Sequence, residues 1–439
     1  MARHRKWERL PRGRRRLGLL ALSLLSLSVT LVEVLRLTRH RPESRVYVGA
    51  MQGPSIDEPQ FPRVLELLTG THLDPGNRVE MLLNGDATFP RLWRDLASAR
   101  RTITMQMYYA RPGRVSDTLA SILCERVRGG VRVLLVLDAF GSVMPRAWLD
   151  GLRACGVEVA VLRQLKWYTL HSATERSHVR AVVVDGRIGY TGGFGLADYW
   201  LGDGRHRDQW RESNVRFEGP AVAGLQAAFT SAWAEVTGEL LGGSGFYPDD
   251  IARDSLGVDA GLLFTAPTIG NTAAERFLAL AIRSARSRLF ITNSYFVPNL
   301  AFRRMLADAG DRGVDVRVLT VSANTDVKTP WLAGRSFYEE LHAHGVRIYE
   351  YQPAMMHAKT IVVDGVWTTI GSMNFDNRSL AFNDEANLVV LDRALGAQME
   401  AEFLEDLRFS TEMTAPILAE RPWWQRLLER GAVLLSHVL

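Results

Sequence analysis

A ten-residue pattern at Met356–Gly365 constrains the fold of this 439-residue chain more than any other feature. It begins with His357 and Lys359, which stand two residues apart at the start of an Ile/Val-rich run. Side chains two residues apart in a strand project from the same face, so Ile361 and Val363 should continue the row of His357 and Lys359. A neutral imidazole beside a fixed ammonium suits phosphoryl chemistry.

The pattern occurs a second time, earlier in the chain. Ser177–Gly186 has His178 and Arg180 at the matching places and is followed by Gly192 and Gly193. Two such strands in one chain predict one active site built from two halves.

Other segments repeat at nearly the same offset. The two histidines are 179 residues apart, and three further matches have offsets of 186, 185 and 189. Four matches in the same order indicate a duplicated domain, whose repeat is far longer than that of a solenoid. The matching pairs are Ser98–Tyr109 with Ser284–Phe296, Gly130–Leu134 with Asp315–Leu319, and Gly156–Val159 with Gly345–Ile348.

Helical and strand patterns alternate from about residue 78, which is typical of α/β layers. The predicted fold is α/β, with two domains that each have a mixed sheet flanked by helices. We expect these domains at residues 46–245 and 258–415, with their boundary in the Gly/Asp-rich stretch Gly242–Gly261.

The chain begins with a basic segment and an apolar run, predicted as a tail and anchor over residues 1–45. Leu17–Val32 carries no charge, and a retained membrane anchor is favoured over a cleaved signal peptide because no convincing cleavage site precedes Arg36. The positive-inside bias would place the N-terminus in the cytoplasm and the body outside it, although both flanks of the run are basic.

The C-terminal residues 416–439 have an amphipathic helical pattern. Trp424, Leu427 and Leu428 recur at helical spacing with arginines among them. This pattern fits either an interfacial membrane helix or a terminal helix that docks on its own domain.

The net charge is +5, but the first 16 residues contribute +7, so the remainder carries −2. A body near neutrality gives no support for a broad nucleic-acid-binding surface. Cys124 and Cys155 are too few for a disulfide framework and lie in no metal-ligand spacing, so zinc is not expected and the compartment stays open.

A carboxylate follows each histidine motif and is a candidate to hold the second nitrogen of an imidazole. These are Glu212 and Glu385. Asp185 and Asp364 each precede a glycine, which is a tight-turn signal, so we assign both a structural role.

These motifs resemble the phospholipase D superfamily, whose signature is H-x-K-x4-D followed by G-S/G-x-N. The second half matches fully, and its flanks resemble bacterial cardiolipin synthases, for example in Tyr295–Pro298. The resemblance covers residues 78–439 and implies duplicated domains packed about a pseudo-two-fold axis around one active site. The matching residues are His357, Lys359, Asp364, Gly371, Ser372 and Asn374.

The resemblance implies that the chain is a phosphatidyltransferase, held in the bacterial inner membrane by a single span. We expect no metal, cofactor, nucleic acid or obligatory protein partner. His178 would attack the phosphorus of phosphatidylglycerol, and His357 would act as acid and base. Arg180, Lys359, Ser372 and Asn374 would hold the phosphate oxygens, whereas Gly192, Gly193 and Gly371 belong to the motif framework. A second phosphatidylglycerol as acceptor gives cardiolipin and glycerol, and water makes the enzyme a phospholipase.

Two residues of the first half depart from the signature. Arg180 replaces lysine, and Gly195 stands where asparagine is expected. Losing one preorganised donor can cost roughly 3 kcal/mol in a transition state. These departures motivate one alternative, a catalytically degenerate lipid-binding protein. A separate alternative within the superfamily is a phosphodiesterase acting on lipid or nucleic acid, and the −2 charge of the body argues against nucleic acid.

Overall fold

The computed structural model describes all residues except 1–22, 24–25, 29–52, 165–174, 267–272 and 435–439. Residues Met1–Arg45 and Val46–Leu439 form separate units. The predicted anchor lies outside the described residues except for Ser23 and residues 26–28, which are helical. Among the described parts of the chain, no helix has the length and apolarity needed to cross a membrane.

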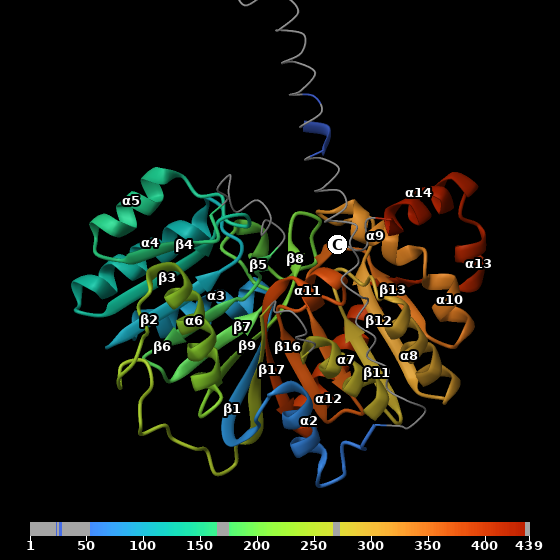
Figure 1. The fold of residues 1–439 in the computed structure, drawn as a ribbon, viewed down its shortest axis with the longest axis horizontal. Coiled ribbons are helices and arrows are strands. Elements are labelled where there is room, and N and C mark those ends of the chain that lie inside the picture. The colour runs from blue at the N-terminus through green and yellow to red at the C-terminus, as the bar shows by residue number, and fades with distance from the viewer. Residues whose placement is uncertain (1–22, 24–25, 29–52, 165–174, 267–272, 435–439) are drawn as a thin grey trace, which may run out of the picture. The chain divides into compact units, whose positions relative to one another are not determined.

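The unit Val46–Leu439 is a mixed α/β structure (Figure 1). A leading helix and the first half contain α2 (Phe61–Thr69), β1 (Asp74–Leu83), α3 (Asn84–Ala97), β2 (Thr102–Met107), α4 (Arg114–Arg128), β3 (Arg132–Asp138), α5 (Arg146–Ala154), β4 (Glu158–Leu162), β5 (Arg176–Ser177), β6 (Ala181–Val184), β7 (Ile188–Gly192), the 3-10 helix η2 (Asp198–Trp200), β8 (Trp210–Arg211), β9 (Ser213–Glu218) and α6 (Val222–Thr237).

The second half has the same alternation and two further helices at its end. It contains β10 (Val258–Thr265), α7 (Ala273–Ser284), β11 (Arg288–Thr292), α8 (Leu300–Asp311), β12 (Asp315–Val321), α9 (Lys328–Arg335), α10 (Tyr338–Ala343), β13 (Arg347–Tyr351), β14 (Met355–Met356), β15 (Thr360–Val363), β16 (Trp367–Gly371), α11 (Asn377–Ala381), β17 (Asn383–Leu391), α12 (Arg393–Leu407), β18 (Ser410–Glu412), α13 (Ala415–Ala419) and α14 (Trp423–Val433).

The strands of the two halves follow the same order. The first half runs β4-β3-β2-β6-β7-β9-β1, and the second runs β13-β12-β11-β15-β16-β17-β10. In each half the first two pairings are parallel and the others antiparallel. β1 pairs with β10, so the two halves share one continuous sheet. This order places the two motif hairpins, β6–β7 and β15–β16, at matching positions.

Each motif hairpin turns at an Asp-Gly pair in the left-handed region. Asp185 and Asp364 have φ angles of 54° and 50°. The carboxylate of Asp185 accepts backbone N–H groups of residues 100–102, and that of Asp364 accepts those of residues 286–288. Both aspartates therefore tie a hairpin to the start of the neighbouring strand, β2 or β11, rather than lining the site.

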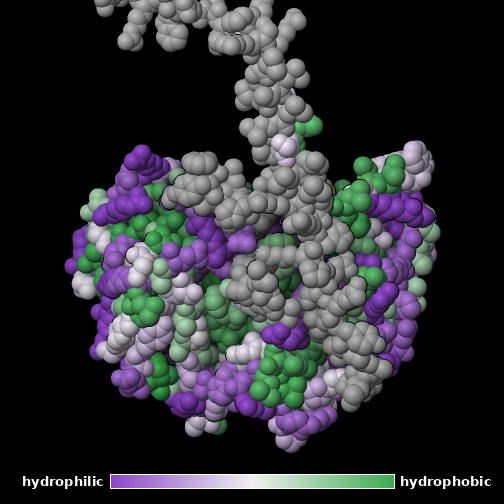
Figure 2. Space-filling model, viewed as in Figure 1, coloured by the Kyte–Doolittle hydropathy of each residue, from purple (hydrophilic) through white to green (hydrophobic). Residues whose placement is uncertain are grey.

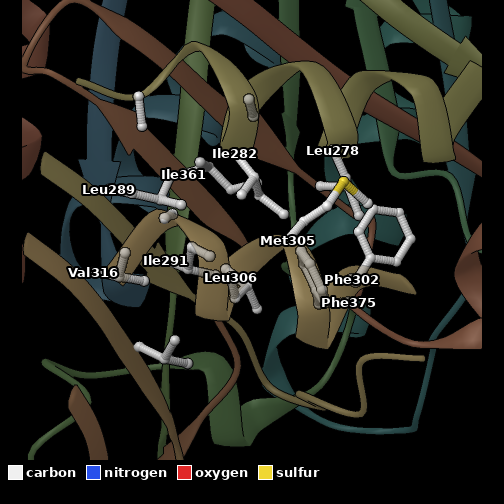
Figure 3. Close-up of a cluster of buried hydrophobic side chains, with 14 of the residues drawn as sticks. Leu278, Ile282, Leu289, Ile291, Phe302, Met305, Leu306, Val316, Ile361 and Phe375 are labelled. Carbon is white, nitrogen blue, oxygen red and sulfur yellow. The ribbon is translucent and has the colours of Figure 1, made fainter. Parts of the chain in front are cut away.

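The core of the second half lies between its sheet and the helices α7 and α8. Leu278 and Ile282 of α7 meet Met305 of α8 above Ile291 of β11 (Figure 3). Phe61 of α2 joins this cluster and packs against Trp367 at 5.0 Å between ring centroids. α2 precedes the first half in the sequence but is buried against the second.

The predicted C-terminal helix is two helices, because Pro422 separates α13 from α14. One face of α14 docks on α9 through Ala432 and the buried Glu429, which accepts hydrogen bonds from Arg335 and Arg421. Trp423, 77% exposed, and four other apolar residues remain on the outside, and apolar side chains are visible over α14 in Figure 2. The docked helix expected for this segment is thus confirmed, and the exposed apolar face leaves the interfacial membrane role a prediction. The other four residues are Trp424, Leu427, Leu428 and Leu434.

Cys124 and Cys155 form a disulfide, which the sequence did not predict. The cysteines are 31 residues apart, but α4 and the end of α5 bring their Cα atoms to 5.5 Å. This separation lies in the normal range for a disulfide.

Candidate active site

His178 and His357 lie just before their strands rather than within them. β6 begins at Ala181 and β15 at Thr360, one residue after each cation. The backbone N–H of His178 donates to the carbonyl oxygen of Asp384, and that of His357 donates to the carbonyl oxygen of Arg211. Each histidine backbone is therefore hydrogen-bonded to the opposite half, which explains why the regular ladder starts later than predicted.

The two histidine–carboxylate pairs are crossed between the halves. His357 Nδ1 lies 2.6 Å from Oε2 of Glu212, and His178 Nδ1 lies 3.0 Å from Oε2 of Glu385. All four side chains are buried. With Nδ1–H donating to the carboxylate, Nε2 of each imidazole is left for a reacting group.

Both glutamates are predicted from their place after each motif, whereas the crossing of the pairs between the halves is not. The backbones of Ser372 and Gly193 interact with His178 and His357, respectively, so each imidazole also meets the glycine-rich turn of the other half.

A cation accompanies each histidine. Arg180 donates through Nη1 to the carbonyl oxygen of His178 at 2.7 Å, and Lys359 donates to the matching carbonyl of His357. Lys359 also donates to Ser294 Oγ at 2.9 Å. Arg180 is buried, and its Nε has no hydrogen-bond partner among the residues that the structure describes, so the guanidinium keeps a donor for a ligand.

Burial and the two cations set the protonation of the site. Desolvation, together with the charges of Arg180 and Lys359, lowers the pKa of both imidazoles well below its ordinary value, so both are neutral near pH 7. Desolvation raises the pKa of Glu212 and of Glu385 to about 7. It also lowers the pKa of Lys359 to about 7. A bound phosphate would compensate the buried positive charge.

The hydroxyl of Ser372 does not point freely at a ligand. It donates to Glu385 Oε2 at 2.6 Å and accepts the N–H of Ala386 at 3.0 Å. Its contacts therefore differ from the predicted phosphate-binding role, because the nearest strong acceptor is the carboxylate that orients His178. The backbone N–H of Asn374 donates to Ser379 Oγ, and its Oδ1 is buried without a hydrogen-bond partner in the described part of the chain.

The surroundings of the two histidine–carboxylate pairs differ, although the two motifs predict similar ones. Glu385 is surrounded by polar donors, including Ser372 and the amide of Asn383. His357 is surrounded by aromatic rings, with Trp210 at 4.7 Å and Trp200 at 5.5 Å between centroids. The offset of 179 between the two histidines aligns Trp200 with Ser379, and the offset of 173 between the two glutamates aligns Trp210 with Asn383. These aromatic-to-polar exchanges were the available signal in the sequence.

The replacement of lysine by Arg180 is accompanied by a second difference between the halves. Tyr108 occupies the place that Ser294 has in the second half, 186 residues later. Its ring lies 5.4 Å from the Arg180 guanidinium carbon and edge-on to His178 at 4.8 Å. A planar guanidinium is attracted to an aromatic face, whereas an ammonium donates a hydrogen bond to a hydroxyl. Tyr108 therefore suits Arg180, and Ser294 suits Lys359.

Two buried histidines, each held by a carboxylate from the other half and accompanied by a cation, form an arrangement suited to phosphoryl transfer. The comparisons with known proteins agree. Residues 278–407 match the family model described as cardiolipin synthase, PLD-like domain. Cardiolipin synthase A of Pseudomonas putida is 33% identical over 367 residues, covering 83% of this chain and 75% of the relative. That of Pseudomonas syringae is 33% identical over 365 residues with the same coverage.

The chain therefore belongs to the cardiolipin synthase family of phospholipase D-like proteins. Phosphatidylserine synthase of Haemophilus influenzae has the same fold, with a TM-score of 0.67 at 14% identity over 86% of this chain and 100% of that one. Polyphosphate kinase of Porphyromonas gingivalis matches with a TM-score of 0.52 at 12% identity, over 83% and 53% of the two chains.

Proposed function

We propose that this protein is a phosphatidyltransferase that makes cardiolipin from two molecules of phosphatidylglycerol. The observation that carries the proposal is the crossed pairing of His178 with Glu385 and of His357 with Glu212, with Arg180 and Lys359 beside them. The family relationship supports the lipid substrate. Two duplicated phospholipase D-like domains, packed about a pseudo-two-fold axis, would supply the two halves of the site.

The reaction proceeds in two steps. His357 takes up a proton when the anionic phosphate binds beside the two cations, because the phosphate charge favours the imidazolium. Nε2 of His178 then attacks the phosphorus, the bond to the leaving glycerol oxygen breaks, and His357 donates its proton to that oxygen. His357 then takes the proton of a hydroxyl of the second phosphatidylglycerol. This oxygen attacks the phosphorus, and the P–N bond to His178 breaks. Cardiolipin and glycerol result, and the enzyme returns to its starting state.

The charge of the intermediate is stabilised by protein groups. Arg180 and Lys359 would hold the non-bridging oxygens, with the amide of Asn374 as a neutral donor. Ser372 would act through Glu385, because its hydroxyl is bound to that carboxylate. These assignments require no metal ion.

The lipid substrate requires the site to lie near a membrane. The N-terminal apolar run would anchor the chain, and the exposed apolar face of α14 would enter the interface. Disulfides persist in oxidising compartments, so the bond between Cys124 and Cys155 supports a body on the periplasmic side, in agreement with the positive-inside bias.

Incubation of the purified full-length protein with labelled phosphatidylglycerol tests the proposal. Cardiolipin and glycerol should form in equal amounts, and neither should form with H178A or H357A. Phosphatidic acid alone would identify a phospholipase. Cleavage of single-stranded DNA in place of lipid, or lipid binding without turnover, would refute the proposal in favour of the nucleic-acid or degenerate alternative.

A further inference from the structure

Two hydroxyls that bond to Glu385 in the second half, those of Ser372 and Ser379, have no counterpart in the first, and neither has the amide of Asn374. At the repeat offset of 179, Ser372 corresponds to Gly193, Asn374 to Gly195, and Ser379 to Trp200. Glu212 therefore has no serine hydroxyl at either matching place, although it holds His357 as Glu385 holds His178.

Trp200 occupies the space that these exchanges open. A Cβ atom on Gly195 would lie 2.7 Å from Cζ3 and 2.8 Å from Cη2 of the indole, closer than real Cβ atoms approach. Position 195 is thus a glycine because the Trp200 ring lies against it. Trp200 is 1% exposed, so its ring is a fixed part of the interior.

The same ring supplies a donor to the carboxylate. Nε1 of Trp200 donates to Oε2 of Glu212 at 3.3 Å, and this oxygen lies 2.6 Å from Nδ1 of His357. Ser379, the counterpart of Trp200, makes a side-chain hydrogen bond to Glu385. One residue position therefore serves the histidine-holding glutamate in both halves, with an indole N–H in one and a hydroxyl in the other.

We propose that Trp200 is the positioning residue that replaces the missing polar groups of the first motif, so that the departure at Gly195 is a compensated exchange. Its N–H keeps the Glu212 carboxylate aimed at Nδ1 of His357, and its ring fills the volume of an asparagine. The inference rests on the proposed function, and it contradicts the expectation that Gly195 weakens the site.

The substitution Trp200→Phe tests the N–H while keeping most of the ring. Turnover of phosphatidylglycerol should fall roughly 10- to 100-fold, because a hydrogen bond to a charged group is lost. The acid limb of the kcat profile should move to higher pH, because this bond lowers the pKa of Glu212. Trp233→Phe is the matched control, since its indole donates to Glu239 at 2.9 Å far along the chain from the motifs, and it should leave both quantities unchanged.

A double substitution tests the compensation itself. Gly195→Asn alone should inactivate the protein, because the asparagine meets the indole. Gly195→Asn with Trp200→Ser recreates the second-half pattern and should recover at least tenfold over Gly195→Asn. Wild-type turnover and an unmoved pH profile in Trp200→Phe would overturn the proposal, as would a double variant no more active than Gly195→Asn.

A measurement without substrate separates this inference from the proposed function. In ¹⁵N-histidine-labelled protein, assigned with H357A, the Nδ1–H tautomer of His357 should be populated less in Trp200→Phe than in wild type, while His178 is unaffected. An unmoved His357 would overturn the inference. A shifted His357 in a protein that does not turn over phosphatidylglycerol would refute the proposed function and leave the inference standing.

Discussion

Glu385 and Glu212 are the residues through which each half orients the histidine of the other. Glu385 accepts hydrogen bonds from Ser372 at 2.6 Å and from Asn383 at 3.3 Å, which leaves it little freedom to turn away from His178. An orienting carboxylate fixes the tautomer of a reactive imidazole and stabilises the charge that develops on it.

Replacement of this carboxylate by an amide should therefore impair chemistry more than folding. We expect Glu385→Gln to lower kcat roughly 100-fold or more, with the melting temperature close to that of wild type. Glu420→Gln, an exposed substitution on the α13–α14 connection, is the control. Wild-type kcat in Glu385→Gln, measured as cardiolipin formation, would contradict the orienting role.

The pH dependence of kcat/KM should follow the loss of the ammonium charge of Lys359. Burial disfavours its ammonium and lowers its pKa to about 7, so the free enzyme loses this charge as the pH rises through neutrality. We expect kcat/KM to fall above about pH 7, because the phosphate then meets one cation instead of two. In Lys359→Arg the guanidinium stays charged, and this fall should disappear from the profile, whereas Lys328→Arg should retain it. A wild-type profile that stays flat to high pH would argue against a buried lysine at the phosphate.

α14 combines a buried polar contact with an exposed apolar face. Glu429 is 1% exposed and compensates the charges of Arg335 and Arg421, while the opposite face carries Trp423 and Trp424. The ionic contact fixes the helix to its domain, and the exposed face is then held in one orientation.

Removal of the Glu429 carboxylate should weaken the docking of α14 on α9. Glu429→Ala removes one of the two carboxylates that each buried guanidinium contacts, leaving Glu350 on Arg335 and Glu339 on Arg421. Because hydrogen bonds to charged groups are lost, we expect the free energy of unfolding to fall by about 2 kcal/mol. Urea denaturation of the variant beside Glu405→Ala, whose ion pairs lie nearer the surface, measures the difference. Equal stability of the two variants would show that Glu429 does not hold the helix.

The exposed indoles of α14 should enter a lipid interface. In vesicles of phosphatidylglycerol that carry nitroxide-labelled lipid, part of the tryptophan fluorescence of the full chain should be quenched. Trp423→Phe with Trp424→Phe should remove most of that part, because these rings are 77% and 52% exposed. Trp233→Phe, which changes a buried indole, should not. Quenching that persists unchanged without Trp423 and Trp424 would assign membrane contact to another segment.

At the scale of the whole molecule, one continuous sheet brings two sequence-distant motifs to one place. β1 and β10 join the halves edge to edge, and the short strand β8 pairs with β14 across them. The backbone of each motif histidine is bonded to the other half, so neither half alone holds a complete histidine–carboxylate pair.

The disulfide between Cys124 and Cys155 predicts that the body lies in an oxidising compartment. If the body lies outside the cytoplasm, Cys124 and Cys155 should be unreactive to maleimide in denatured membrane extracts until a reductant is added. Mass spectrometry of the alkylated protein reads this directly, with Cys124→Ser as the control that leaves one reactive thiol. Full labelling without reductant would place the body in a reducing compartment.

The sequence by itself determined the α/β alternation, the repeat and the residues of both motifs. These are local properties: β-branched runs form strands, Asp-Gly pairs form turns, and a repeated pattern folds the same way twice. Only the tertiary structure decided which glutamate holds which histidine, that Ser372 is bound to Glu385, that Trp200 fills the space beside Gly195, and that Cys124 meets Cys155. Such contacts join residues far apart in the chain, and their partners are set by how the halves pack, which no local pattern records.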